Sequence, residues 1–314
     1  MSYRVLFFGT ASFSVPLLEA LAADSRFSVC GVVTQPNRPA GRKGVLTSPA
    51  TKRAAEGKHI PVFQFETVKD TNVIQQLSAL RPDIIVVASF GQIIPQTLLD
   101  AAPQGAINFH WSLLPLYRGA SPVQAAIIHG DQKTGATIML MDAKMDHGPI
   151  LNQFEEPILP EETADALYHR LGAIGAPILT HTIANYLEGT ITPRVQIHTE
   201  ATFVKLLSRD DGRLDPLHKT AQELERIVRA YYPWPGTYLP WKDGRLKIQS
   251  AAVGPSTEFT PGTAFDVKGI PAIACLEGTS LLLSRVQPES KAAMDGASFL
   301  RGRQDWLSYV ILPA

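Results

Sequence analysis

The sequence predicts an α/β protein of two domains, the first built on a Rossmann-like, mostly parallel sheet and the second smaller and mostly β. In the first half of the 314-residue chain, short apolar runs alternate with helical periodicity, which is typical of βαβ units. After Gly189 the sequence becomes polar and loses its periodicity until about Phe203. Beyond that stretch, short apolar runs separated by Pro, Gly and Asp indicate a small barrel or sandwich.

The elements of the first domain are predicted from hydrophobic periodicity. Residues 83–89 contain an unbroken Ile-Ile-Val-Val-Ala run, the composition of a strand that is buried on both faces. An amphipathic stretch over 163–187 predicts a long helix, which Pro177 could kink or divide. The other elements predicted in this domain are strands at 5–8, 28–34, 106–109 and 137–141 and a helix within 15–22.

We therefore divide the chain into a first domain at 1–189, a linker at 190–206 and a second domain at 207–314. The second domain is expected to start with a helical segment and to continue with short strands. The helix is predicted at 220–230, and the strands at 237–241, 246–253, 262–267, 273–275 and 280–286.

Composition excludes several classes of protein. The 29 Lys and Arg residues balance the 29 Asp and Glu residues, so overall charge does not indicate a nucleic-acid or lipid partner. Cys30 and Cys275 are too far apart in the sequence to suggest a disulfide framework or a zinc site. No apolar run reaches the roughly 18 residues of a membrane helix, and Gly9 and Glu19 interrupt the apolar start, unlike a signal peptide. We expect a soluble, cytoplasmic monomer without membrane contact.

Two polar side chains end a predicted strand in the pattern of a catalytic site. If residues 106–109 form a strand, Asn108 and His110 point to the same face at its carboxyl end, where open parallel sheets place their ligands. An amide NH2 and an imidazole can both donate to a carbonyl oxygen that gains negative charge during acyl transfer. An Asn and a His with this spacing near a loop more often have a structural role.

Asp146 supplies a carboxylate directly after another predicted strand. Close to His110, it would favour the charged imidazolium and could take a proton from an attacking amine. Asp146-His147-Gly148 is also ordinary turn chemistry, so a turn without a catalytic role is the alternative. The eight histidines form no metal-binding motif, and no metal is predicted.

A basic segment rich in Pro and Gly follows the second predicted strand. Arg38, Arg42 and Lys43 lie in this loop and could contact phosphates, although such charges can also be merely solvated. The earlier turn at residues 8–13 keeps only Gly9 of the three-glycine dinucleotide fingerprint, which disfavours a nicotinamide oxidoreductase.

Taken together, these residues resemble the formyltetrahydrofolate-dependent formyltransferases, and the similarity extends over almost the whole chain. Within that family, the match is closest to members that formylate the methionine carried by initiator tRNA. The segments that carry the resemblance are Asn108-Phe109-His110, Ser112-Leu113-Leu114-Pro115, Tyr117-Arg118-Gly119-Ala120, Met145-Asp146-His147-Gly148, the Thr-Gln-Pro-Asn-Arg-Pro-Ala-Gly-Arg run at 34–42 with Ser48-Pro49, Pro61-Val62-Phe63-Gln64 and the Arg-Ala-Tyr-Tyr-Pro-Trp-Pro run at 229–235.

The resemblance implies a folate-binding catalytic domain followed by a small, OB-like β-barrel that helps to hold tRNA. It implies 10-formyltetrahydrofolate as co-substrate and initiator methionyl-tRNA as acceptor. By this likeness Asn108, His110 and Asp146 are the catalytic residues, and the loop with Arg38, Arg42 and Lys43 approaches the tRNA. The residues expected to bind folate are Ser112, Leu113, Leu114, Pro115, Phe90, Gly91 and Asp142.

The chain departs from the family pattern beside the site and in its second domain. Trp111 stands where the family commonly has glycine, Leu116 where it has a basic residue, and Pro149 where it has an acid. From 207 to 314, 13 Lys and Arg residues face 12 Asp and Glu residues, a net charge of +1 where a distinctly basic domain would be expected. The alternatives are a formyltransferase for an amino sugar nucleotide or another small amine, and a tRNA-binding protein without turnover.

Overall fold

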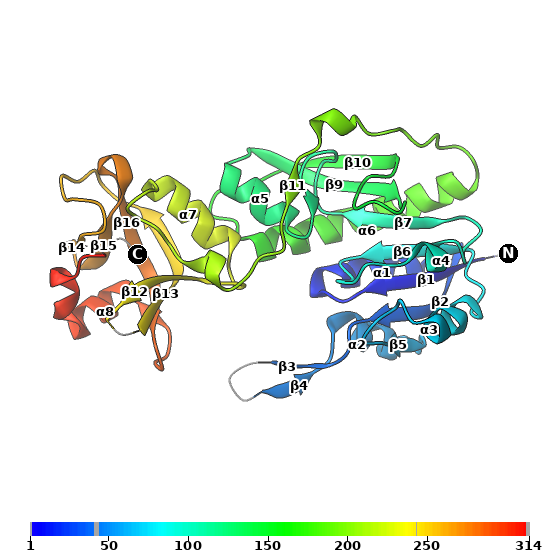
Figure 1. The fold of residues 1–314 in the computed structure, drawn as a ribbon, viewed down its shortest axis with the longest axis horizontal. Coiled ribbons are helices and arrows are strands. Elements are labelled where there is room, and N and C mark those ends of the chain that lie inside the picture. The colour runs from blue at the N-terminus through cyan, green and yellow to red at the C-terminus, as the bar shows by residue number, and fades with distance from the viewer. Residues whose placement is uncertain (1, 41–43, 243, 312–314) are drawn as a thin grey trace. The chain divides into compact units, whose positions relative to one another are not determined.

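The structure is a computed structural model that describes residues 2–40, 44–242 and 244–311 (Figure 1). Its contacts divide the chain into two compact units. The first comprises Met1–Pro122, Lys133–Pro157 and Tyr168–Val204, and the second comprises Val123–Gln132, Ile158–Leu167 and Lys205–Ala314. Among the described helices, none combines the length and the apolar character needed to cross a membrane.

The first unit contains a seven-stranded sheet in the order β10-β9-β7-β6-β1-β2-β5. The five strands from β7 to β5 run parallel, and β9 and β10 add antiparallel pairs at one edge. The prediction of a mostly parallel sheet is therefore confirmed. The strands are β1 (Tyr3–Gly9), β2 (Phe27–Thr34), β5 (Val62–Gln64), β6 (Ile84–Ala88), β7 (Ala106–His110), β9 (Lys133–Leu140) and β10 (Ile150–Pro157).

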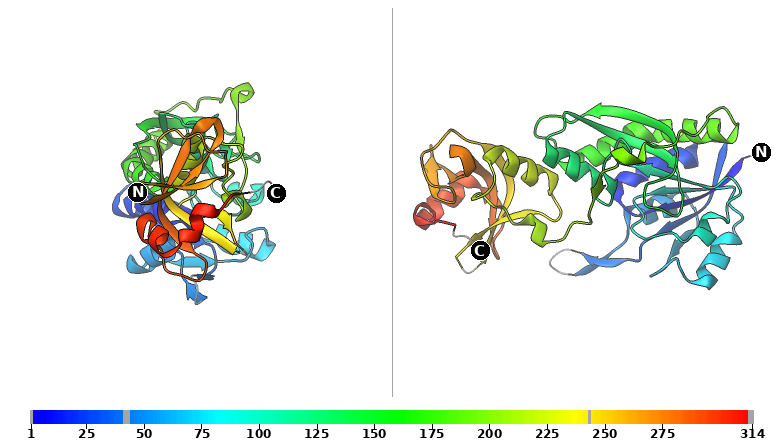
Figure 2. Two further views of the ribbon diagram at one scale, coloured as in Figure 1. Left: turned by 90° about the vertical axis from the view of Figure 1, so that its left-hand side faces the viewer. Right: turned by 45° about the horizontal axis from the view of Figure 1, so that its top comes forward.

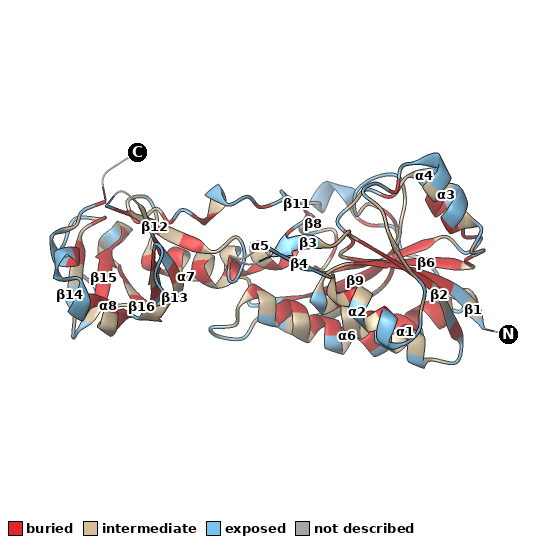
Figure 3. Ribbon diagram, turned by 90° about the horizontal axis from the view of Figure 1, so that it is seen from below, coloured by how far each residue is buried: buried red, intermediate tan, exposed pale blue. Residues whose placement is uncertain are grey.

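Helices cover both faces of this sheet, so its central strands are buried on both sides. All five residues of β6 are buried, as the run of β-branched residues predicts, and Figure 3 shows the same strand in red. The helices of the first unit are α1 (Val15–Ala23), α2 (Ala50–Gly57), α3 (Thr71–Ser78), α4 (Gln96–Leu99) and the larger part of α6 (Ala164–Leu187).

Helix α6 packs closely on the sheet because two of its residues are glycines. A Cβ at Gly175 would lie 2.3 Å from Cζ of Phe109, and a Cβ at Gly172 would lie 2.4 Å from the carbonyl oxygen of Phe13. The helix continues through Pro177, which therefore does not divide it. The close contact fixes β7 at Phe109, between the two polar residues that the sequence predicts as a site.

Two smaller elements lie beside this sheet. A hairpin of β3 (Arg38–Ala40) and β4 (Val45–Thr47) carries the basic loop, and it extends away from the sheet in both views (Figures 1 and 2). The stretch after α6 lies on the first unit, where β11 (Phe203–Val204) pairs in parallel with β8 (Arg118–Gly119). Arg194 in the same stretch forms an antiparallel bridge with Ile150.

The second unit contains an antiparallel sheet in the order β12-β13-β16-β15-β14, with β17 paired to β16. Its apolar residues form a separate core around Trp306 and Phe299. Helix α7 begins at a capping box, in which Thr220 and Glu223 satisfy each other's backbone N–H groups. The elements are α5 (Pro122–His129), α7 (Ala221–Ala230), β12 (Thr237–Trp241), β13 (Gly244–Val253), β14 (Ala264–Val267), β15 (Ile270–Ala274), β16 (Ser280–Pro288), β17 (Met294–Asp295) and α8 (Gly296–Gly302).

We expect Gly175→Ala to lower the free energy of unfolding by about 1–3 kcal/mol, the usual cost of overpacking a core. Phe109 cannot move aside easily, because its ring also contacts Trp111 and Phe154. Urea unfolding followed by circular dichroism measures the change. Gly57→Ala is the matched control, because no atom lies within 4 Å of a Cβ at that helical position. Equal unfolding midpoints for the two variants would contradict the packing described here.

Candidate active site

Two side chains at the carboxyl end of β7 meet a carboxylate from the loop between β9 and β10. Asn108 Nδ2 donates a hydrogen bond to Asp146 Oδ1 over 3.2 Å. The same oxygen lies 3.5 Å from His110 Nδ1. Residues 108 and 110 share one face of the strand, while Phe109 points to the opposite face and contacts α6. The structure thus brings together the three residues that the sequence proposes as a trio.

One hydrogen bond of His110 identifies a ring nitrogen that carries a proton. The side chain is only 5% exposed, and its Nε2 lies 3.0 Å from the carbonyl oxygen of Tyr117. A carbonyl oxygen can only accept, so Nε2 carries a proton. Nδ1 faces the Asp146 carboxylate at a distance longer than an ordinary hydrogen bond. A proton on Nδ1 would therefore remain available to a small ligand placed between the two side chains.

Asp146 is held in place through its backbone and through both carboxylate oxygens. Its φ of 49° lies in the left-handed region, which costs a non-glycine residue on the order of 1 kcal/mol or more. Its Oδ2 accepts a hydrogen bond from the backbone N–H of Gly119 over 2.8 Å. Gly119 has φ 118°, and a Cβ there would lie 2.2 Å from the carbonyl oxygen of Val204. Glycine is therefore required at the residue that orients this carboxylate.

A buried glutamine that the sequence analysis did not identify supports the Asp146 loop. Gln196 is 4% exposed, and its Nε2 donates to the carbonyl oxygens of Asp146 and Gly148 over 3.0 and 2.7 Å. Its Oε1 accepts from Arg118 Nη2 over 2.7 Å. Gln196 belongs to the stretch assigned to a linker, where the absence of periodicity gave no signal for such a role.

The residues expected to bind folate surround the trio in sequence and differ in exposure. Ser112 is fully buried, and its hydroxyl donates to the carbonyl oxygen of Leu116 over 2.6 Å. Leu114 packs with Met139 and Ile150, whereas Leu113 and Pro115 are half-buried.

The two other segments expected at the folate site adjoin this region. Phe90 is buried against Phe8, and its carbonyl oxygen accepts from Thr10 Oγ1 and Gln35 Nε2. Gly91 is exposed and has φ 87°. Asp142 Oδ2 lies 2.7 Å from His147 Nδ1 and therefore already has a partner within the protein. Phe90 is buried and Gly91 has no side chain, so these two residues can offer backbone groups, whereas Asp142 can offer its carboxylate.

Trp111 fills the space behind the site. It is 4% exposed, and its ring contacts Phe109 and Phe13 edge to face, with ring centroids 4.7 and 5.0 Å apart. Its Nε1 donates to Ser89 Oγ over 2.9 Å. Ser89 has φ 51° at the end of β6, directly before Phe90. Trp111 therefore links the strand that carries His110 to the loop that carries Phe90.

Of the three basic residues predicted in the loop, Arg38 lies in the described part of the chain. Arg38 is exposed and forms an ion pair with Glu66, with Nη2 2.6 Å from Oε2. Arg42 and Lys43 lie outside the described residues. Salt bridges between exposed side chains contribute little stability, so the pair with Glu66 leaves Arg38 free to exchange partners.

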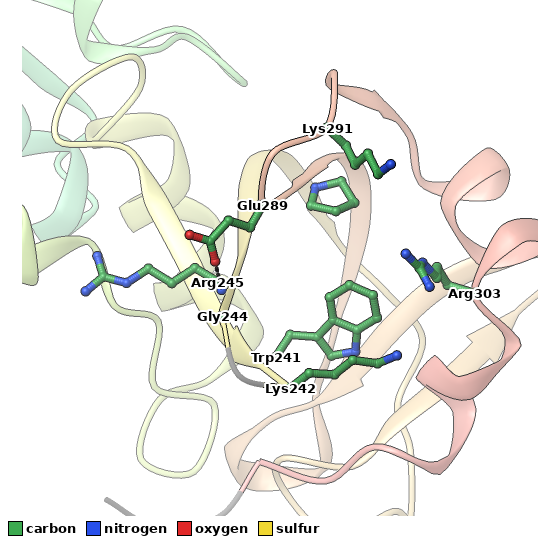
Figure 4. A pocket seen from close by; sticks show the side chains of 8 residues that line it. Trp241, Lys242, Gly244, Arg245, Glu289, Lys291 and Arg303 are labelled. Carbon is green, nitrogen blue, oxygen red and sulfur yellow. Dashed lines mark hydrogen bonds between the residues drawn. The ribbon is translucent and has the colours of Figure 1, made fainter. Parts of the chain in front are cut away.

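Four cations gather around one pocket of the second unit, although the net charge there is close to zero (Figure 4). The pocket has a volume of about 310 Å³ and surrounds the ring of Trp241. Lys242 and Arg303 lie over this ring, 5.0 and 5.6 Å from its centroid. Among the described residues, the acids nearby include Asp305, which pairs with Lys242, and Glu289. The cations that line the pocket are Lys242, Arg245, Lys291 and Arg303.

An amide, an imidazole and a carboxylate at the carboxyl edge of a doubly wound sheet are typical of an enzyme that stabilises an oxyanion. Comparison with known proteins identifies the family. Residues 3–183 match the family model described as Formyl transferase, and residues 206–304 match its C-terminal domain. The chain belongs to the formyl transferase family, so the resemblance drawn from the motifs is confirmed.

Two relatives of similar length are named methionyl-tRNA formyltransferase. The methionyl-tRNA formyltransferase of Roseiflexus sp. (strain RS-1) is 45% identical over 96% of this chain and 93% of the relative. That of Bacillus subtilis (strain 168) is 41% identical over 95% of this chain and 94% of the relative. In fold, the chain is similar to an N-formyltransferase from Helicobacter canadensis solved with folinic acid and dTDP-3-aminofucose, with a TM-score of 0.64 and 17% identity over 90% of this chain and 99% of that one.

We expect Gln196→Ala to destabilise the first unit by about 1–3 kcal/mol, because it leaves buried hydrogen-bonding groups of Arg118 and the Asp146 loop without a partner. Chemical unfolding monitored by tryptophan fluorescence measures the loss. Val195→Ala is the control, since the neighbouring side chain is 73% exposed. Identical stability of the wild type and the Gln196 variant would show that these hydrogen bonds do not hold the loop.

Proposed function

We propose that the chain transfers the formyl group of 10-formyltetrahydrofolate to the amino group of methionine esterified to initiator tRNA. The relatives named methionyl-tRNA formyltransferase, at 41–45% identity over nearly the whole chain, support this acceptor. The observation that carries the chemistry is the convergence of Asn108, His110 and Asp146 around one carboxylate oxygen. These three groups match the needs of an amine that attacks a carbonyl carbon.

Asn108 and His110 stabilise the negative charge that develops on the formyl oxygen. The Asn108 amide has two N–H bonds, and only one is needed for the hydrogen bond to Asp146. In the protonated form of His110, Nε2–H is bound to the Tyr117 carbonyl and Nδ1–H faces the site. Two donors that are already oriented toward one point lower the free energy of a tetrahedral oxyanion relative to the substrate carbonyl.

Asp146 accepts the proton that the attacking amine must lose. The nitrogen forms a bond to the formyl carbon and becomes a cation, and transfer of its proton to the carboxylate leaves a neutral amine nitrogen on the tetrahedral intermediate. Collapse of this intermediate breaks the bond from the formyl carbon to N10 and forms the amide, and the proton that Asp146 accepted passes to N10, so that tetrahydrofolate leaves and the carboxylate is restored. The backbone N–H of Gly119 keeps the Asp146 carboxylate oriented during these steps.

The folate is proposed to bind between the end of β6 and the segment after β7. Exposed Gly91 offers a close approach to backbone, and the half-buried side chains of Leu113 and Pro115 offer apolar contact to a flat ring system. Trp111 and Ser89 keep these two segments in register through their hydrogen bond. Asp142 supplies a carboxylate at the same edge of the sheet.

The tRNA is proposed to contact the basic loop and the second domain. Arg38, Arg42 and Lys43 provide positive charge near residues 38–47, where the hairpin extends away from the sheet. Lys242, Lys291 and Arg303 concentrate positive charge beside Trp241, in a domain whose net charge is nearly zero (Figure 4). Local clusters of this kind are sufficient to attract phosphates, because the attraction depends on nearby charges rather than on the domain total.

We expect His110→Ala and Asp146→Ala each to lower turnover by roughly 10² or more, as for the loss of a positioned acid–base group. Formyl transfer from 10-formyltetrahydrofolate to methionyl-tRNA is measured under saturating substrates. His181→Ala removes a histidine from the exposed surface of α6 and serves as control. Near wild-type turnover in either variant, with both proteins folded, would remove this mechanism.

We expect Lys291→Ala to weaken tRNA binding and to reduce the slope of log affinity against log salt concentration by about one, the effect of a single lost phosphate contact. Binding is measured by filter retention at several salt concentrations. Lys268→Ala is the matched control from the same domain, outside the pocket. An unchanged slope in the Lys291 variant would exclude a role for this pocket in phosphate binding.

A further inference from the structure

Several exposed apolar side chains lie in the segments that are hydrogen-bonded to the Asp146 loop, where the chemistry is proposed to occur. Phe203 is 70% exposed in β11, which pairs with the strand that contains Gly119. The segments that carry these side chains are joined by hydrogen bonds, from Arg118 N to the Thr202 carbonyl and from Gln196 Nε2 to the Asp146 carbonyl. The other exposed apolar residues of these segments are Leu116, Met145, Val195 and Ile197.

In the same segments, the guanidinium of Arg118 contacts two aromatic groups, the ring of Phe203 and the stacked rings of His147 and His198. The ring of His147 stacks on that of His198, with centroids 3.9 Å apart and the planes nearly parallel at 5°. The Arg118 guanidinium lies 5.9 Å from the centroid of Phe203, and Nη2 of the same arginine lies 2.9 Å from His198 Nδ1. Arg118 therefore contacts both Phe203 and His198, and its chain neighbour Gly119 binds Asp146; we call Phe203, His198 and Arg118 the platform.

The electrostatics of the platform favour a neutral, electron-rich ligand. A guanidinium can only donate, so His198 Nδ1 accepts the hydrogen bond from Arg118 and is unprotonated. Desolvation, and then the charges of His147, Arg118 and Lys144, hold the pKa of His198 below its ordinary value. His198 thus presents a neutral ring near pH 7.

Arg118 itself is incompletely satisfied. It is 3% exposed, and its Nε has no hydrogen-bond partner among the described residues. The partners of its Nη2 are a neutral amide oxygen and a neutral imidazole, so its positive charge is not cancelled by them. Because the guanidinium itself is buried, the surfaces that a ligand can contact are the exposed rings of Phe203 and His198, which Arg118 holds in place.

We propose that Phe203 and His198, joined by Arg118, form a stacking site for the terminal nucleobase of the acceptor RNA. This inference rests on the proposed function, because only a few bonds separate the reacting amine of an aminoacyl ester from the terminal ribose. When that amine contacts Asp146, the terminal nucleoside has to lie within reach of the neighbouring surface. Single-stranded RNA ends are bound by stacking of their bases on Phe, His and Arg side chains, which matches the composition of this platform.

The experiment is a double-mutant cycle between the protein and the RNA. Two fluorescent RNA hairpins are compared, each with a single-stranded 3′ end, one with a terminal adenosine and one with the same ribose lacking its base. Dissociation constants are measured by anisotropy, without folate or turnover, for the wild type, Phe203→Ala and Phe203→Tyr. Base removal and Phe203→Ala are each expected to weaken binding about tenfold, the range for one base on one aromatic ring.

The two changes together are expected to weaken binding no more than either one alone, and Phe203→Tyr should restore the dependence on the base. Phe259→Ala is the control, since it removes another exposed phenylalanine, and it should change both dissociation constants by the same factor. Equal affinity of the wild type for the two hairpins, or additive losses in the cycle, would overturn the stacking site even with intact formyl transfer. A lack of formyl transfer to methionyl-tRNA would instead contradict the proposed acceptor and leave the binding result standing.

Discussion

The site depends on the fixed orientation of one carboxylate, that of Asp146. One of its oxygens accepts from Asn108 and faces His110, and the other accepts from the Gly119 backbone. The left-handed backbone at Asp146 is strained, and the buried side chain of Gln196 holds the loop in this conformation. The energy of these surrounding hydrogen bonds therefore maintains a geometry that the loop alone would not adopt.

A strand and a helix of the first unit hold Asn108 and His110 in position. Strand β7 aligns the amide and the imidazole, and the close packing of α6 on Phe109 keeps the strand in place. The stretch after α6 then approaches the site from outside and supplies Gln196 and Phe203. The regular sheet thus carries Asn108 and His110, and a segment without regular structure holds the Asp146 loop through Gln196. Functional residues on irregular segments are commonly positioned by a rigid scaffold in this way.

Much of this arrangement could be predicted from the sequence, and the failures have physical reasons. The buried strand at Ile84–Ala88 and the long helix at Ala164–Leu187 carry strong periodic signals, and both were predicted nearly in full. Strand β10 was missed, because it lies at the sheet edge and its Asn, Gln and Glu residues weaken the apolar pattern. Asn108 and His110 stand at the carboxyl end of a predicted strand and Asp146 follows another, but the family resemblance was needed to select them, because their spacing alone also fits structural roles. Gln196 acts through tertiary hydrogen bonds that leave no local pattern. The role of Trp111 likewise depends on Ser89, from another strand.

A crystal structure of the chain with a stable 10-formylfolate analogue that cannot transfer its formyl group tests most directly whether Asn108, His110 and Asp146 surround the formyl group. We expect the formyl oxygen to lie about 3 Å from both Asn108 Nδ2 and a ring nitrogen of His110, as an oxyanion donor pair requires. Asp146 should then flank the open face from which an amine approaches the formyl carbon. A formyl group bound outside the reach of these side chains, or with its oxygen turned away from both donors, would contradict oxyanion stabilisation by Asn108 and His110.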